Sequence, residues 1–325
     1  MIWIYFIAIA AVIIFAGSKL SVLAEKLAGL LNISSSAIGL LLVGIITSLP
    51  ELSTSLGAVL KVGEPNLALG NTLGSDLFNL MIIALCDLLF RKKGLLRNAG
   101  HRIAPLLYYL LMISAVCLTL TLPNSIALLG MHFNIGSLAI IATYLFIFFR
   151  THKTSGEHAS PTPIEDRSEL GKTIAQFSIA AIVIVVAGII LAQLGDRIAE
   201  QTGLEQSFVG TLFLAFATSL PELTVSITAM RIGAYDMMLG NILGSNMFNV
   251  FVAAITDLAY RKEAFHFSDD CISPNLLLIA GCAIAMTFVA MIAIKQKKKA
   301  RVVAWESIVM IALYAAGLYA LYIGS

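Results

Sequence analysis

Charged side chains are scarce in this sequence, because only 12% of its 325 residues are Asp, Glu, Lys or Arg. Soluble globular proteins usually carry charge on about a quarter of their residues. So few charged residues cannot provide the polar surface of a protein that is exposed to water on all sides. The composition therefore excludes a cytosolic enzyme, a nucleic-acid-binding protein and a disordered scaffold.

Cysteine and histidine are also too few and too scattered to build a framework. The four cysteines have no CxxC spacing, and Cys86, Cys117 and Cys282 lie in apolar stretches. No two of the five histidines have metal-ligand spacing. The cysteines are interpreted as packing residues, and neither a disulfide framework nor a cofactor is predicted.

Apolar residues make up 59% of the chain, and the mean hydropathy is +0.92. They occur in runs of about 18–25 residues, which predicts membrane-spanning helices and not the short alternating strands of a membrane barrel. The first apolar run has no basic residues before it, so a first membrane helix is favoured over a cleaved signal peptide. Ten spans are predicted, at residues 2–18, 35–60, 66–89, 103–122, 125–149, 173–195, 207–230, 236–259, 274–294 and 302–323.

A polar segment, residues 151–171, divides these spans into five and five and is interpreted as a flexible linker. With the N-terminus outside, 17 of the 21 Lys and Arg residues fall in inside loops. Because positive charge concentrates on the cytoplasmic side, both termini are predicted outside the cell membrane and the linker in the cytoplasm. In a bacterial cell this is the inner membrane.

Two sequence motifs occur twice. The chain reads GLLLVGIITSLPELSTSLGAV from Gly39 and GTLFLAFATSLPELTVSITAM from Gly210, 171 positions later. It reads GNTLGSDLFNLMIIALCDLLFRK from Gly70 and GNILGSNMFNVFVAAITDLAYRK from Gly240, 170 positions later. Five spans is an odd number, so the halves, 1–150 and 172–325, must be inverted, as in secondary transporters. A duplicated structural bundle is disfavoured, because packing alone has no need to repeat TSLPE and GNxxGS.

Each TSLPE copy places a proline and a glutamate deep in a span. Proline removes a backbone donor and frees carbonyl oxygens, which are tolerated in a membrane only where they face a cavity or a ligand. Glu51 and Glu222 have no Lys or Arg on their own spans. An unpaired carboxylate at such depth is a functional-site candidate, and a bound cation would remove its cost.

Helical spacing aligns further oxygen atoms with these glutamates. The sets with four-residue spacing are Thr47, Glu51 and Ser55; Thr218, Glu222 and Ser226; Asn71, Ser75 and Asn79; and Asn241, Ser245 and Asn249. Together they provide carboxylates, hydroxyls and amides without a thiol or a basic group. Ca²⁺ prefers six to eight oxygen ligands of this kind, although Na⁺ or protons could occupy the same cage.

Helix packing is the alternative interpretation of the small residues. It is favoured for Gly70, Gly74, Gly240 and Gly244, whereas ligation is favoured for the serines and asparagines of GNxxGS(D/N)xFN. Asp87 and Asp257 repeat near span ends and are interpreted as interface residues.

The paired TSLPE and GNxxGS(D/N)xFN motifs resemble the repeats of the calcium/cation antiporter superfamily, the sodium/calcium exchangers, and in particular their short prokaryotic members. This resemblance implies a fold in which spans one and six slide across a core of the remaining eight spans. It implies that Glu51 and Glu222 are the central Ca²⁺ and Na⁺ ligands. It further implies backbone carbonyl ligands at Thr47 and Thr218, and sodium positions lined by the serines. These serines, and the asparagines that complete the middle of the site, are Ser48, Ser219, Ser75, Ser245, Asn79 and Asn249.

The sequence departs from the family pattern at one position. Several sodium-coupled relatives have aspartate where this chain has Asn249, and here the extra acid is Asp76, opposite Asn246 in the other repeat. Asp76 can share a helix face with Asn79 and join the metal ligands, or it can be hydrogen-bonded within the bundle. The departure leaves proton coupling open, because a carboxyl group removed from water holds its proton more tightly.

The predicted function is therefore antiport of Ca²⁺ against Na⁺, with proton-coupled Ca²⁺ antiport as the alternative. A cation channel is disfavoured, because channel filters are usually built by symmetric subunits around one pore. An intramembrane enzyme is disfavoured, because no Arg, Lys or His accompanies the two acids. The expected partners are the two ions and the lipid bilayer, with no nucleic acid, and a monomer is expected.

Overall fold

The structure is a computed structural model that describes residues 1–90, 103–122, 125–128, 131–157, 167–202, 215–260, 273, 275–295 and 305–323. Within these ranges the chain is helical apart from one short hairpin. Eight helices in the described ranges are long and apolar enough to cross a membrane. The prediction of a helical, multi-pass membrane protein is confirmed.

The long helices follow the predicted spans. They are α1 (Ile2–Leu31), α5 (Pro65–Leu89), α6 (Ile103–Thr121), α7 (Ile135–Glu157), α8 (Arg167–Thr202), α11 (Tyr235–Tyr260), α12 (Asn275–Lys295) and α13 (Trp305–Ile323). The second predicted span is divided into α2 (Ser35–Ile38), the π-helix η1 (Gly39–Val43), α3 (Gly44–Thr47), α4 (Leu49–Gly57) and the π-helix η2 (Ala58–Val62). In the seventh span, α10 (Leu220–Ile232) follows a helical turn at residues 215–218.

Two predicted spans are incompletely described. Residues 207–214 of the seventh span and residues 302–304 of the tenth span lie outside the described residues. In the tenth span the apolar helix found is Trp305–Tyr319, which is shorter than the eight membrane-length helices of the described ranges. The count of ten spans therefore stays a prediction.

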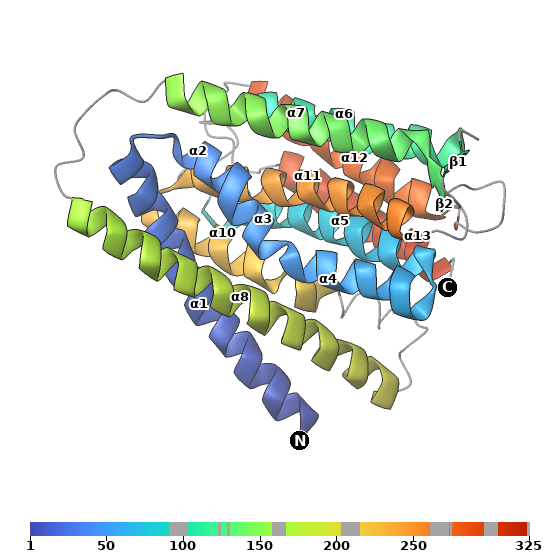
Figure 1. The fold of residues 1–325 in the computed structure, drawn as a ribbon, viewed down its shortest axis with the longest axis horizontal. Helices are drawn as coiled ribbons and strands as arrows, with labels where there is room; N and C mark the ends of the chain where they lie inside the picture. The colour runs from blue at the N-terminus through green and yellow to red at the C-terminus, as the bar shows by residue number, and fades with distance from the viewer. Residues whose placement is uncertain are drawn as a thin grey trace.

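The helices α5 and α11 form the centre of the molecule. Their most apolar windows are 78% and 89% buried, against 33% for α1 and α8. The two central helices pack against each other, and α12 and α13 pack against α5. Figure 1 shows α1 and α8 along one edge of the bundle, where α1 crosses α8 obliquely. The repeated GNxxGS motifs thus lie on the two most buried helices.

Several helices are longer than the apolar runs that predict them. α1 continues to Leu31 instead of ending at residue 18, and α8 covers residues 167–202 instead of 173–195. α7 ends at Glu157, so that helices enter both ends of the predicted linker, whose residues 158–166 lie outside the described residues. Hydropathy marks the part of a helix that contacts lipid, whereas the backbone hydrogen bonds of a helix can continue into water.

The prediction that the fifth span begins as a helix at residue 125 is wrong. Strand β1 (Ser125–Leu128) pairs antiparallel with β2 (Met131–Asn134), and α7 begins only at Ile135. The Asn134 side chain accepts a 2.9 Å hydrogen bond from the backbone N–H of Gly136, as a residue that caps a helix N-terminus does. An apolar run without strict periodicity does not distinguish a short strand from a helix start.

Candidate functional site

The two TSLPE copies interrupt their helices at the serine. Ser48 separates α3 from α4 with φ −96° and ψ 8°, and Ser219 precedes α10 with φ −88° and ψ 9°. Pro50 and Pro221 lie in the first turn of the helix that follows, where proline removes no helical hydrogen bond. The interruption places each glutamate in the first turn of a new helix, where exposed N–H groups favour negative charge.

The two copies meet in the centre of the molecule. Ser48 Oγ donates a 2.8 Å hydrogen bond to Glu222 Oε1, and Ser219 Oγ donates a 3.4 Å hydrogen bond to Glu51 Oε1. Each glutamate is therefore bound by the serine of the other copy. Glu51 is 1% exposed and Glu222 is fully buried. Two buried acids, one from each half of the chain, lie at one place.

Each of these carboxyl groups keeps one oxygen atom without a partner. Glu51 Oε2 and Glu222 Oε2 are buried and accept no hydrogen bond. In the described ranges, the ion pair found joins Lys26 to Glu169 at a partly exposed position, and no cation lies beside the two glutamates. Buried charges without a counter-charge are strongly destabilising, and either a bound cation or a proton would remove this cost.

Hydroxyl groups surround the acids. Thr47 Oγ1 lies 3.2 Å from Ser245 Oγ and 3.3 Å from Asn241 Oδ1. Ser245 Oγ donates to the backbone carbonyl of Gly44 at 3.1 Å, and Thr218 Oγ1 donates to the carbonyl of Ala215 at 3.2 Å.

Ser75 on α5 is fully buried, and its Oγ atom has no partner. The predicted threonines and serines are thus all buried in the core. Their assignment as ligands stays a prediction.

Asn71 and Asn241 hold the helices of each half together. Asn71 Nδ2 donates to Ser55 Oγ at 2.9 Å, and Asn241 Nδ2 donates to Ser226 Oγ at 3.2 Å. The two contacts match, because each joins the asparagine of a GNxxGS motif to the serine four positions after the glutamate of the same half.

Asn79, Asn249 and Asp76 form a second group of polar residues. Both side-chain polar atoms of Asn79, and Asn249 Oδ1, are buried without partners. Asn249 Nδ2 donates to Asp76 Oδ1 at 3.1 Å, and the Tyr109 hydroxyl donates to Asp76 Oδ2 at 3.0 Å. No group of three or more Asp, Glu, His or Cys residues in the described part of the chain could hold a metal together. Asp76 therefore does not form a three-acid cluster with Glu51 and Glu222.

Tyr109 was not predicted from the sequence. It is fully buried on α6, in an apolar run, 103–122, that also contains the hydroxyl groups of Tyr108, Ser114, Thr119 and Thr121. Nothing in its spacing identifies a partner on α5.

Glycines allow α11 to approach closely the broken helix, which is the interrupted second span from Ser35 to Val62. A Cβ atom on Gly44 would lie 2.7 Å from the Ser245 backbone nitrogen, and one on Gly244 would overlap the Leu40 carbonyl oxygen. Gly240 has a similar contact with the Ser36 backbone. The packing role predicted for Gly240 and Gly244 is confirmed, and this contact brings Ser245 next to Thr47. The same role predicted for Gly70 and Gly74 is wrong, because a Cβ atom at either position would meet no described atom within 4 Å.

Asp87 and Asp257 make equivalent contacts at the start of other helices. Asp87 Oδ2 accepts a 2.9 Å hydrogen bond from Ser307 Oγ near the start of α13. Asp257 Oδ2 accepts a 2.6 Å hydrogen bond from Ser137 Oγ near the start of α7. The two serines are 170 positions apart, like the two aspartates. Their predicted role as interface residues is confirmed.

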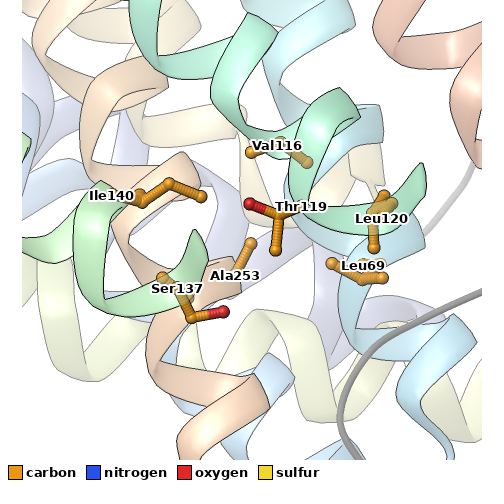
Figure 2. Close-up of a pocket in the computed structure, with 8 residues that line it drawn as sticks. Leu69, Val116, Thr119, Leu120, Ser137, Ile140 and Ala253 are labelled. Atoms are coloured by element: carbon orange, nitrogen blue, oxygen red, sulfur yellow. The ribbon is translucent and has the colours of Figure 1, made fainter. Parts of the chain in front are cut away.

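A separate cavity lies between α5, α6, α7 and α11 (Figure 2). Its volume is about 10 Å³, which is room for about one water molecule. Apolar side chains line most of it, and Thr119 and Ser137 add hydroxyl groups. None of its lining residues belongs to the site around Glu51 and Glu222.

The sequence matches the model of one protein family, described as sodium/calcium exchanger protein, over residues 1–151 and 172–323. An uncharacterized membrane protein of Methanocaldococcus jannaschii is 26% identical, and the match covers 98% of each chain. The sodium/calcium exchanger MaX1 of Methanosarcina acetivorans is 25% identical, and the match covers 92% of each chain. The inner membrane protein YrbG of Escherichia coli is 28% identical over 77% of this chain and 80% of YrbG.

Solved structures have the same fold. A structure of the sodium-calcium exchanger NCX_Mj superposes with a TM-score of 0.75 at 21% identity, covering 99% of this chain and 100% of that one. A structure of the sodium/calcium exchanger from Methanococcus jannaschii superposes with a TM-score of 0.71 at 20% identity, covering 98% and 99%. This likeness shows that the whole described architecture is shared.

Proposed function

The chain belongs to the sodium/calcium exchanger protein family, and from this membership we propose that it exchanges Ca²⁺ for Na⁺ across the membrane by alternating access. The family consists of ion exchangers and not of enzymes. The transported ions are the substrates, and the site needs no cofactor for their exchange.

The observation that carries the proposal is the crossed pair of serine–glutamate contacts with one free oxygen on each glutamate. Two negative charges match the charge of one Ca²⁺, and Na⁺ ions can replace it at the same oxygens. We assign Glu51 and Glu222 as the central ligands of both ions. An occluded state then requires bound cations, because empty carboxylates would be buried without compensation. This requirement couples the two fluxes.

The remaining ligands of the proposed site come from both halves. Carbonyl oxygens of Thr47 and Thr218, freed at the helix breaks, would supplement the carboxylates of the central position. Hydroxyls would line the sodium positions, and the amide oxygens of Asn79 and Asn249 would complete the middle. These hydroxyls belong to Ser48, Ser219, Ser75 and Ser245. The unpartnered oxygens at Ser75, Asn79 and Asn249 support this assignment, because buried polar atoms normally have partners.

The proposed architecture is ten spans in two inverted halves, residues 1–150 and 172–325, joined by a cytoplasmic linker at 151–171. Both termini would then lie outside the cell membrane. The equivalent contacts Asp87–Ser307 and Asp257–Ser137 support the duplication, because each joins the same positions of the two halves.

The contacts of α1 and α8 support a sliding motion. A Cβ atom on Gly188 of α8 would lie nearest to Pro50, whereas the atoms nearest to a Cβ on its counterpart Gly17 of α1 belong to Thr224 and Val225. Thr224 follows Pro221 by three positions, which is about 4.5 Å along a helix. The two halves thus differ in the position of one helix, as they would in one of two alternating states.

The test is ⁴⁵Ca²⁺ uptake into proteoliposomes under an imposed Na⁺ gradient. Uptake that requires internal Na⁺ supports the proposal, whereas Ca²⁺ flux without any counter-ion would indicate a channel. The second candidate is proton-coupled exchange, which Asn249 favours because the acid of several sodium-coupled relatives is absent there. Uptake driven only by a pH gradient would replace Na⁺ by H⁺ as the coupling ion.

A further inference from the structure

Asp76 is a buried acid whose two carboxyl oxygens each accept a hydrogen bond. It is fully buried on α5, between two proposed ligand positions, Ser75 and Asn79. Asp76 Oδ1 accepts from Asn249 Nδ2 at 3.1 Å, and Oδ2 accepts from the Tyr109 hydroxyl at 3.0 Å. Its backbone carbonyl accepts a further bond, 3.1 Å from Asn246 Nδ2. The carboxylate is thus held by two helices, α6 and α11.

The contact with Asn249 determines how that amide is oriented. The bond runs from Asn249 Nδ2 to Asp76 Oδ1, and this oxygen accepts whether the carboxyl group is ionised or carries a proton on Oδ2, so the NH₂ group of Asn249 faces Asp76. The carbonyl oxygen of Asn249 then points the other way, and it is buried without a partner. Asn249 is one helical turn from Ser245, which contacts Thr47, so both side chains lie on the face of α11 that meets the broken helix.

The other half of the chain lacks this arrangement. Asn246 occupies the position that corresponds to Asp76, and its NH₂ group bonds the Asp76 backbone and not the side chain of Asn79. Both polar atoms of Asn79 are without partners, so nothing in the described residues fixes which end of its amide faces the site. The acid at position 76 therefore has a specific consequence for Asn249.

We propose that Asp76 is a positioning residue, which Tyr109 holds in place and which turns the carbonyl oxygen of Asn249 towards the transported cation. This inference rests on the proposed function. Asp76 acts through Asn249, because both of its carboxyl oxygens accept hydrogen bonds from Asn249 and Tyr109, whereas the buried oxygen left without a partner is that of Asn249. A single asparagine at position 249 thereby presents an oxygen reliably, although an amide has only one.

The test compares Ca²⁺ binding and exchange in Asp76→Asn and the wild type. An amide at position 76 can donate or accept, so the Asn249 amide can turn its NH₂ group to the ion. We expect the Kd of the purified protein for ⁴⁵Ca²⁺ to rise about tenfold, with KM rising in parallel and kcat changing less than twofold. Tyr109→Phe removes one support and should raise Kd about threefold.

The matched control is Asp87→Asn, the same change on the same helix about 16 Å away. Its partner is Ser307, so it should leave Kd unchanged even if the protein becomes less stable. The rescue is the double variant Asp76→Asn/Asn249→Asp, which exchanges donor and acceptor. A carboxylate at position 249 presents an oxygen in either orientation, so Kd should return to within about threefold of the wild type.

An unchanged Kd in Asp76→Asn overturns the inference, and so does a raised Kd that the double variant leaves unrestored. The latter result would make Asp76 a direct ligand or a general support of the fold. A wild-type protein that neither binds ⁴⁵Ca²⁺ nor exchanges it overturns the proposed function itself. The two failures are therefore distinguished by the wild type alone.

Discussion

Ser21 on α1 donates a 3.2 Å hydrogen bond to the backbone carbonyl of Val225 on α10. The position that corresponds to Ser21 in the second half is Ala192 on α8, which has no hydroxyl group. A second contact nearby joins Thr228 Oγ1 to Ser18 Oγ at 3.2 Å. Hydroxyl groups of α1 thus bind α10 in the conformation described, and the equivalent position of α8 cannot do the same.

Replacing Ser21 with alanine should therefore shift the protein towards its other conformation. A lost hydrogen bond is worth about 1 kcal/mol, which corresponds to about a fivefold change in a two-state population. Spin labels on α1 and α10 would measure this change as a new distribution of distances. Thr143→Ala is the control, because the Thr143 hydroxyl bonds the Ala139 carbonyl of its own helix. Equal distributions in Ser21→Ala and the wild type would contradict the expectation.

Glu51→Gln and Glu222→Gln should each abolish exchange. Glutamine keeps the shape of glutamate and removes the charge that neutralises the ion. Ca²⁺ should raise the Tm of the wild-type protein, because a ligand that binds the folded state stabilises it. The Tm of either variant should be almost unchanged, because neither binds the ion. Ion flux measured in proteoliposomes completes the test. Wild-type flux in the variant with both changes would refute the assignment of the two acids.

A disulfide between α1 and α10 should stop transport. A Cβ atom added to Gly17 would lie 3.2 Å from Thr224 Cβ, slightly less than the separation of about 3.5–4.5 Å in a disulfide. In a background without the four native cysteines, Gly17→Cys/Thr224→Cys should form a disulfide on oxidation and lose exchange until it is reduced. The pair Gly17→Cys/Pro221→Cys tests the other state, because its cysteines meet only if α1 slides by three residues. Full exchange by the oxidised first pair would exclude sliding at this contact.

The central features of the site could be predicted from the sequence because they depend on unusual chemistry. A proline inside an apolar run kinks or breaks a helix, and Pro50 and Pro221 each lie in the first turn of a new helix directly after the interruption at Ser48 or Ser219. The structure confirms that the two breaks meet. The closeness of Glu51 and Glu222 follows from this meeting, although their ligand role is still to be measured.

Contacts between distant segments could not be predicted in this way. Tyr109 meets Asp76 through the packing of α6 on α5, and no spacing along either helix specifies that contact. The start of α7 depends on Asp257, whose carboxylate binds the Asn134 backbone 123 positions away. Hydropathy reports the solvent around a segment and not its hydrogen bonds. The boundaries predicted from it therefore included the hairpin in the fifth span and placed the end of α1 too early.

The close crossing of α11 with the broken helix should tolerate no added methyl group. In Gly244→Ala the new Cβ atom would overlap the backbone of Leu40, which cannot rotate away as a side chain can. The helices must then separate, at a cost of about 1–3 kcal/mol. We expect a lower Tm and a higher KM for Ca²⁺, because Ser245 would move away from Thr47. Gly281→Ala is the matched control, since a Cβ atom there meets no described atom within 4 Å and the residue is exposed. Equal Tm and KM values for the two variants would show that the crossing is looser than the glycine contacts indicate.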